Sequence, residues 1–242
     1  MAGSPVKWVP CERTMLISVI IPALNEANRL PPLIEALQAE AVQCEIIVVD
    51  GGSEDDTKRV AAAAGARVIE AQRGRGQQIF AGCAAARGDV FLHLHADTIF
   101  PAGGLAAIER ALEPNDQIVG GNFNIVFDGD TDFARWLTDF YAWFRGYGLY
   151  YGDSGIFVRR SVYEKLGGIR PIAVMEDLDF SRRLEQAGET VCIQEPAVIS
   201  SSRRFAGRKR WRIVTGWIVM HVLYFLGISP DRLAVLYNAA RR

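Results

Sequence analysis

The sequence of 242 residues is poor in cysteine and in lysine, and it contains no hydrophobic run of transmembrane length. Its four cysteines include no pair at metal-ligand spacing, so we expect buried thiols in a reducing compartment and neither a disulfide framework nor a structural zinc site. A formal net charge of −1 argues against a general nucleic-acid binder. No nucleic-acid partner is therefore expected.

Two common phosphate-binding signatures are also missing. There is no Gly-Lys-Ser/Thr P-loop, and the first predicted strand leads into Pro22-Ala23-Leu24-Asn25-Glu26 rather than a Gly-x-Gly-x-x-Gly turn. Only four of the 27 basic residues are lysines. Arginine suits bidentate phosphate contacts, although a compositional bias explains the surplus equally well. A nucleotide diphosphate bound here would need its charge met by a cation or by arginines such as Arg73 and Arg75.

The first half of the chain alternates between strand and helix patterns. Buried strands are predicted over 16–22, 45–50, 67–71 and 90–94. Before the last of these, Arg73 to Gly76 predicts a loop, and Gln77 to Arg87 predicts an alanine-rich helix. Such an alternation indicates a parallel sheet with helices on both faces.

An acidic residue follows three of these strands: Glu26, Asp50 and Asp97. Parallel strands end at the same edge of a sheet, and ligands bind in the crevice outside those ends. The three carboxylates are therefore expected to converge there, with Mg²⁺ or Mn²⁺ between them and a bound phosphate. Taken alone, Asp97 is explained equally well by an Asx turn before a helix near Pro101.

The second half has a different character. Residues 117–127 predict a strand, and 133–147 predict an aromatic helix whose rings belong either to the core or to a sugar-binding surface. A further helix opens with Glu176 and Asp177, where the helix dipole favours the ionised carboxylate that a general base requires. Simple complementation of the dipole is the competing interpretation.

The tail combines a basic cluster with an uncharged segment over 213–228. These 16 residues fall short of the about 20 that a straight membrane span requires. A core helix is the slightly favoured interpretation for part of the segment. The alternative is a helix in the membrane interface, with Trp211 and Trp217 as anchors and the basic cluster on anionic headgroups. His93 and His221 lie within apolar segments and are expected to be core histidines.

Four motifs occur in order along the chain: Ser18 to Glu26, Val48 to Ser53, His95-Ala96-Asp97 and Glu176-Asp177. Together they resemble the family 2 glycosyltransferases of the GT-A fold, and most closely a small soluble bacterial branch. Further counterparts of that branch are the Arg73 to Gln77 loop, Gly152 to Phe157 and Ser202 to Arg204. The resemblance covers about residues 16–237. It implies an α/β fold with a Rossmann-like, mostly parallel sheet flanked by helices, and a C-terminal helical tail.

The resemblance also implies a function: an inverting glycosyltransferase that moves a single sugar from a UDP- or GDP-sugar to an acceptor hydroxyl. It assigns Asp177 as the general base and Glu176 as a residue that helps to place the acceptor. The implied ligands of the nucleotide sugar are Pro22, Asn25, Glu26, Asp50, Arg75 and Arg204. Asp97 and His95 would hold the metal. His95 replaces the first acid of the family's Asp-x-Asp motif, which favours Mn²⁺ over Mg²⁺.

The same comparison gives the domain prediction. Residues 1–14 show no periodicity and are expected to be a disordered extension, or to follow from a start codon assigned too early. Their lack of an apolar core argues against a secretory signal. The transferase domain is predicted over 15–205, with a nucleotide-binding half at 15–115 and an acceptor half at 116–205. Residues 206–242 are predicted to form a basic and apolar helical tail packed on the domain or on a membrane surface.

Three points stay open at this stage. The acceptor is a small molecule or a lipid, and a polyprenyl-phosphate or other lipid glycosyltransferase is the alternative within enzymes. The location is cytoplasmic, either free or peripheral on the inner face of the cell membrane. A catalytically silent nucleotide-binding module is the alternative outside enzymes. Processive members of the family carry a Gln-x-x-Arg-Trp motif. In this sequence Gly207 stands in place of the glutamine, before Arg208 to Trp211, so transfer of a single sugar is preferred.

Overall fold

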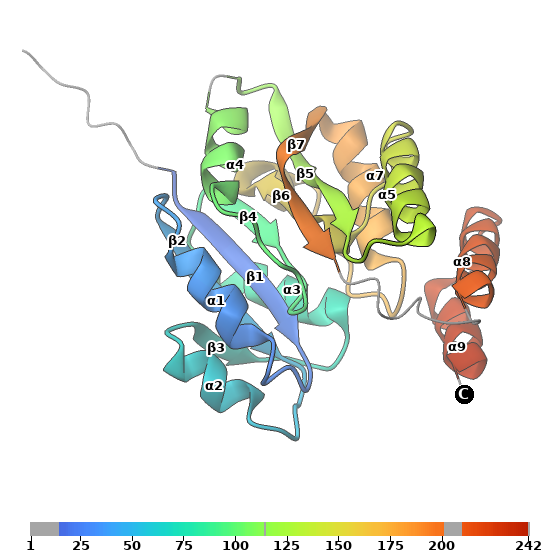
Figure 1. Ribbon diagram of the computed structural model, residues 1–242, viewed down its shortest axis with the longest axis horizontal. Helices are drawn as coiled ribbons and strands as arrows, with labels where there is room; N and C mark the ends of the chain where they lie inside the picture. The colour runs from blue at the N-terminus through green and yellow to red at the C-terminus, as the bar shows by residue number, and fades with distance from the viewer. Residues whose placement is uncertain (1–14, 114, 201–209, 242) are drawn as a thin grey trace, which may run out of the picture.

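The computed structural model describes residues 15–113, 115–200 and 210–241 (Figure 1). At its centre lies a sheet with the strand order β3-β2-β1-β4-β6-β5-β7. The predicted α/β class, with a mostly parallel sheet flanked by helices, is confirmed.

The first half forms the parallel part of the sheet. Its elements are β1 (Ile17–Ala23), α1 (Leu30–Gln38), β2 (Cys44–Asp50), α2 (Thr57–Ala63), β3 (Arg67–Glu70), α3 (Arg75–Ala85) and β4 (Val90–His93). Strand β1 pairs in parallel with both β2 and β4, and β3 pairs in parallel with β2. Alternate residues of β1 point to opposite faces: Val19 packs in the core that includes α1, and Ile20 packs in the core that includes α3.

One local prediction in this half is wrong. Helix α3 begins at Arg75, so the predicted loop at 73–76 ends two residues earlier than expected. Gly76 in the first turn of α3 has no side chain. A Cβ at this position would lie 2.7 Å from the backbone oxygen of Arg170 and would clash with it. The helix can therefore approach the chain just before α7, which brings Arg75 to the edge of the sheet.

The second half adds a mixed part of the sheet. Its elements are α4 (Gly104–Leu112), β5 (Ile118–Phe127), α5 (Asp132–Arg145), the 3₁₀ turn η1 (Gly152–Ser154), β6 (Ile156–Arg159), α6 (Arg160–Lys165), α7 (Glu176–Ala187) and β7 (Glu189–Ser200). Strand β6 is antiparallel to β4 and to β5, whereas β7 is parallel to β5. Strand β7 was not predicted, because Pro196 and scattered polar residues break its apolar pattern.

The tail forms α8 (Arg210–Phe225) and α9 (Pro230–Arg241), which lie at the side of the molecule near α5 (Figure 1). Trp211 of α8 packs against Phe133 and Trp136 of α5. Within α8, Val214 and Met220 are buried. The core interpretation, which was favoured for part of this segment, is therefore confirmed for these two residues, whereas the other face of the helix is exposed. None of the helices in the described ranges combines the length and apolar character that a membrane span needs.

Candidate active site

The carboxyl ends of β1, β2 and β4 meet at one edge of the sheet, as predicted. Ala23 at the end of β1 lies beside Asp50 at the end of β2, and His93 of β4 lies beside Ile20 of β1. The segments that follow these strands therefore start from one edge. Pro22 itself is buried within β1, one residue before the strand ends.

Asp50 is fully buried at this edge. Its Oδ2 accepts hydrogen bonds of 3.0 Å from the backbone N–H groups of Gly52 and Ser53. Its Oδ1 is buried without a hydrogen-bond partner in the described part of the chain. A buried carboxylate oxygen left unsatisfied is costly, so this atom fits a donor brought by a ligand, such as a base or a ribose hydroxyl.

The loops after β1 and β2 are fastened to each other. The Asn25 backbone N–H donates to Ser53 Oγ, and Asn25 Oδ1 accepts from the Glu54 N–H, both at 2.9 Å. Asn25 has φ +57°, an uncommon conformation for a residue with a side chain. Glu26 Oε2 lies 2.8 Å from Arg29 Nη1, so its carboxylate already has a local cationic partner.

His95 and Asp97 follow β4 and differ in exposure. Asp97 is exposed, whereas His95 is half-buried and lines a cavity. His95 Nε2 and Asp177 Oδ2 lie 2.9 Å and 3.6 Å from the point that a Cβ on Gly152 would occupy. The lack of a side chain at Gly152 therefore lets the η1 turn approach both functional groups.

The metal prediction can be compared with the donors present. Among residues 15–113, 115–200 and 210–241, no group of three or more histidine, cysteine, aspartate or glutamate side chains could hold a metal ion. Mg²⁺ and Mn²⁺ in phosphate chemistry commonly take one or two protein ligands and complete their shell with substrate oxygens and water. The short set of Asp97 and His95 fits a cation of that kind, and does not fit a site formed by protein ligands alone.

Helix α7 brings two further acids to the same place. Glu176 is 2% exposed, and its Oε1 lies 2.7 Å from Arg75 Nε. Burial raises the pKa of Glu176 to about 7, with the Asp177 charge adding to the rise and Arg75 opposing it. Arg75, predicted to meet a phosphate, is therefore in contact with a predicted catalytic acid. No local sequence pattern predicts this pair.

Asp177 is half-buried at the cavity. Its Oδ2 accepts a 3.0 Å hydrogen bond from the Gly152 N–H, and its Oδ1 accepts one of 2.8 Å from the Leu178 N–H. These two donors hold the carboxylate in place at the start of α7. The arrangement can accept a proton from a molecule in the cavity.

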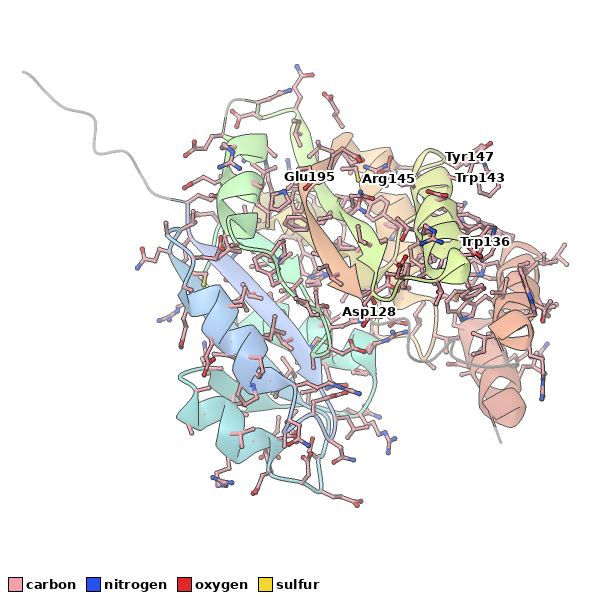
Figure 2. All side chains as sticks on the ribbon, viewed as in Figure 1. Asp128, Trp136, Trp143, Arg145, Tyr147 and Glu195 are labelled. Carbon is pink, nitrogen blue, oxygen red and sulfur yellow. The ribbon has the colours of Figure 1, made fainter. Side chains whose placement is uncertain are left out.

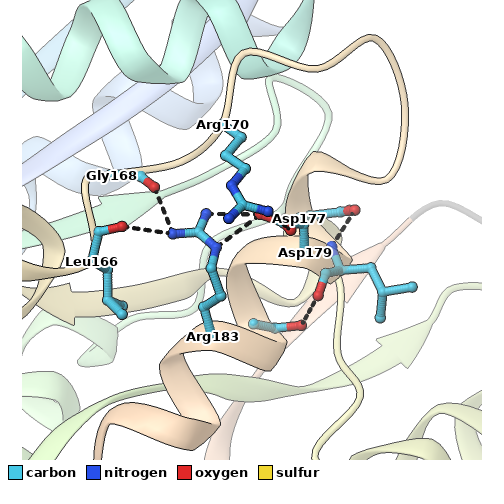
Figure 3. Close-up of polar contacts among 8 residues, drawn as sticks. Leu166, Gly168, Arg170, Asp177, Asp179 and Arg183 are labelled. Atoms are coloured by element: carbon cyan, nitrogen blue, oxygen red, sulfur yellow. Dashed lines mark hydrogen bonds and ion pairs between the residues drawn. The ribbon is translucent and has the colours of Figure 1, made fainter. Parts of the chain in front are cut away.

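The orientation of α7 depends on a second acid of its first turn (Figure 3). Asp179 contacts Arg170 and Arg183, at 2.8 Å for Oδ1 to Arg170 Nη1 and 2.9 Å for Oδ2 to Arg183 Nε. Arg183 Nη1 also donates to the backbone oxygens of Leu166 and Gly168. This network, which sequence analysis missed, ties α7 to the segment after α6 and so fixes the direction in which Asp177 points.

A cavity of about 320 Å³ lies against Asp177, between α5, α7 and α8. His221 is half-buried in its wall, so the prediction of a core histidine is wrong for this residue. His221 Nδ1 lies 2.6 Å from the Trp217 oxygen and must donate to it, which leaves Nε2 to accept from the Tyr151 hydroxyl at 2.9 Å. Burial, with the charges of Asp177 and Asp153, raises the pKa of Tyr151, so its phenol stays a donor.

His93 shows the opposite outcome. It is 2% exposed, its Nε2 lies 3.4 Å from Cys83 Sγ, and burial lowers its pKa to about 3. The prediction of a core histidine is confirmed. Arg204, the remaining predicted site residue, lies outside the described residues, as do residues 1–14.

Comparisons with known proteins identify the family of the chain. The family model described as Glycosyl transferase family 2 matches residues 18–167. Glucosyl-3-phosphoglycerate synthase of Mycolicibacterium paratuberculosis is 35% identical over 96 residues, which cover 35% of this chain and 29% of that protein. An uncharacterised glycosyltransferase of Mycobacterium bovis is 35% identical over 106 residues, covering 43% of this chain and 47% of the relative. The matched segments thus span less than half of these curated relatives.

A solved structure covers more of the chain. Glucosyl-3-phosphoglycerate synthase from Mycobacterium tuberculosis, in complex with Mn²⁺ and UDP-glucose, has a TM-score of 0.61 at 22% identity. The similarity covers 88% of this chain and 80% of that one. At this identity the comparison shows a shared fold.

Proposed function

The chain belongs to glycosyl transferase family 2, and we propose that it is an inverting enzyme that moves one sugar from a nucleotide-diphosphate sugar to an acceptor hydroxyl. The observation that carries this proposal is the Asp177 carboxylate, which faces a cavity at the sheet edge where Asp50 and His95 also lie. A base, a nucleoside-binding carboxylate and a diphosphate-binding edge are the parts that such a transfer needs.

The donor is proposed to be a UDP-sugar, with GDP-sugars as the alternative. The unsatisfied Oδ1 of Asp50 supports a role on the base or ribose. Asn25 and Glu26 lie in the loop after β1, which is hydrogen-bonded to the segment after β2, and would contact the same nucleoside. The similar Mycobacterium tuberculosis enzyme was solved with UDP-glucose and Mn²⁺, which makes this pair the first to test.

Asp97 and His95 would hold a divalent cation, Mn²⁺ in preference to Mg²⁺, together with the donor's diphosphate oxygens. When bound, the cation would supply charge neutralisation to the departing diphosphate. Arg75 lies at the same edge of the sheet. The buried Glu176 would hold its guanidinium in place, so that the guanidinium also stabilises the negative charge of the departing diphosphate. Glu176 then acts on the acceptor side only through Arg75 and through its neighbour Asp177.

Asp177 is proposed to take the proton of the acceptor hydroxyl while that oxygen attacks the anomeric carbon. The new carbon–oxygen bond forms on the face opposite the bond to the diphosphate, which breaks with its electron pair, so the configuration inverts. The Gly152 and Leu178 N–H groups stabilise the carboxylate before the transfer and keep it in place.

The domain division follows as part of the proposal. Residues 15–115 would bind the nucleotide and 116–205 the acceptor, with 206–242 as a tail against the acceptor side. The cavity supports this division, since its lining comes mainly from α5, α7 and α8.

A donor screen tests the proposal directly. UDP-glucose with Mn²⁺ is expected to raise the melting temperature of the full chain more than either component alone, because a ligand that binds only the native state stabilises it. UDP release should follow when an acceptor is supplied. If no nucleotide or nucleotide sugar raises the melting temperature with any divalent cation, the proposal is wrong.

A further inference from the structure

The cavity against Asp177 has two chemically different ends. At one end lie the polar groups of His95, Asp153 and Asp177. The rest of the wall is largely apolar and aromatic, and includes Phe144 of α5 and Trp217, Met220 and Val222 of α8. At about 320 Å³ the space is in the range that small-molecule sites occupy. A purely polar acceptor would leave most of this wall without a partner.

The apolar wall continues to the outside of the molecule. Ile218, Val222 and Phe225 line the cavity and are still 50% to 52% exposed. Trp143 of α5 and Tyr147, two residues after that helix, are also exposed, and Figure 2 shows them toward one end of α5; neither lines the cavity. The exposed part of the wall on α8 is thus apolar at Ile218 and Val222, along which an apolar body can extend, and the guanidinium of Arg182 lies 5.0 Å from the ring centre of Phe225.

The charges at the polar end of the cavity determine which polar group of an acceptor can bind there. Among the described residues that line the cavity, Arg75 is the single arginine or lysine, and it is in contact with Glu176. Asp153 and Asp177 would repel an anionic group placed beside them. A phosphate oxygen is moreover already deprotonated at neutral pH and needs no general base, whereas a hydroxyl does. Both arguments disfavour a lipid phosphate as the acceptor.

We propose that the acceptor is a neutral alcohol with an apolar body, whose hydroxyl reaches Asp177 while the body lies between α5 and α8. This inference rests on the proposed function, because it assigns the cavity to the acceptor of that reaction. It adds the substrate class: an uncharged amphiphile, as opposed to a sugar phosphate, a small anionic acid or a polyprenyl phosphate.

Binding to the full chain tests the inference without requiring turnover. The probes are glucose and its butyl, hexyl and octyl β-glucosides, each below its micellar concentration, measured by calorimetry with UDP and Mn²⁺ present. Affinity is expected to rise with chain length, by up to about fourfold for each methylene that is fully buried. Octyl phosphate is expected to bind more weakly than octyl glucoside. Affinity independent of chain length, or tighter binding of octyl phosphate, would overturn the inference.

A matched pair of variants locates the binding. Val222 lines the cavity and is 50% exposed, whereas Val219 is 54% exposed on the same helix and is not among the lining residues. Val222→Trp should fill the cavity and weaken octyl glucoside at least tenfold, while Val219→Trp should leave its affinity within twofold. Equal weakening by both variants would place the apolar body on the outer surface and contradict the inference. Donor binding by UDP-glucose, measured separately, reports on the proposed function itself.

Discussion

The two sides of the candidate site, which we propose bind the donor and the acceptor, are constructed differently. On the donor side, strands β1, β2 and β4 end side by side, and backbone N–H groups hold Asp50 in position. On the acceptor side, the groups around Asp177 come from α3, η1, α7 and α8, which lie far apart in the sequence. The donor side is therefore a product of the sheet itself, whereas the acceptor side depends on how separate helices pack. Substitutions should affect the two sides separately.

The largest effect is expected from Asp177→Asn. Loss of the general base should lower kcat by about 10²- to 10⁴-fold and leave the affinity for UDP-glucose nearly unchanged. The amide can still accept the Gly152 N–H, so the fold should persist. Steady-state kinetics and donor titration measure the two quantities. Asp116→Asn, at a fully exposed side chain near the start of β5, is the control. Unchanged turnover in Asp177→Asn would remove the base assignment.

Asp50→Asn should affect the opposite side. Removal of the charge weakens the contact to the nucleoside, and hydrogen bonds to charged groups correspond to about 10- to 100-fold in affinity. The dissociation constant of UDP-glucose should rise by that factor, with little change in the affinity for an acceptor analogue. Asp56→Asn, at an exposed side chain before α2, should behave as the native chain. A loss confined to acceptor binding would contradict the separation of the two sides.

Glu176 contacts Arg75 and precedes Asp177, so it lies between the two sides of the site. Its ionisation should change the free energy of unfolding. Its pKa is raised from 4.5 to about 7 on folding, so the native state binds more protons than the unfolded state between these values. The free energy of unfolding should therefore fall by about 1 to 3 kcal/mol as the pH rises from 4.5 through 7. Urea titrations at several pH values measure this slope. Glu176→Gln should flatten it, and an equal slope in the variant would assign the dependence to other groups.

The smallest effect is expected for the hydrogen bond between Tyr151 and His221 of α8, and it should appear in the free energy of unfolding. Tyr151→Phe removes the donor to His221 Nε2, which should lower the free energy of unfolding by about 0.5 to 1.5 kcal/mol. Tyr141→Phe, which removes a 3.2 Å bond to Asp153 in the same cavity, provides a comparison within the described structure. Adding Tyr151→Phe to His221→Ala should cause little further loss, because the bond between the two side chains is already absent in His221→Ala. Full additivity would show that the two side chains act independently.

The sequence predicted the donor side well for a physical reason. Buried parallel strands are continuous apolar runs, and an acid that follows such a run must lie at the sheet edge. Asp50 and Asp97 were predicted in this way, whereas His95 was assigned through the resemblance to the family. Strand β7 escaped prediction, because it is an edge strand interrupted by Pro196 and has no continuous apolar pattern.

The acceptor side was less predictable because its contacts are made by tertiary packing. The ion pair of Arg75 with Glu176 joins the starts of α3 and α7, and no local sequence pattern predicts it. His221 sits in an apolar segment typical of core residues, yet the side of α8 that it occupies faces the cavity. The Gly152 to Phe157 segment was noted in the sequence through the family resemblance, and its approach to Asp177 required the packed structure.

The hydrogen bond from Gly152 to Asp177 has a consequence for how such an enzyme can diversify. A backbone donor is retained whatever side chains surround it, so the position of the base does not depend on the identity of the cavity wall. Substitutions at wall positions such as Phe144 or Met220 change what fits without moving the carboxylate. New acceptors are then accessible by single mutations that preserve the proposed reaction, while Gly152 itself is constrained, because a Cβ there would lie 2.9 Å from His95 Nε2.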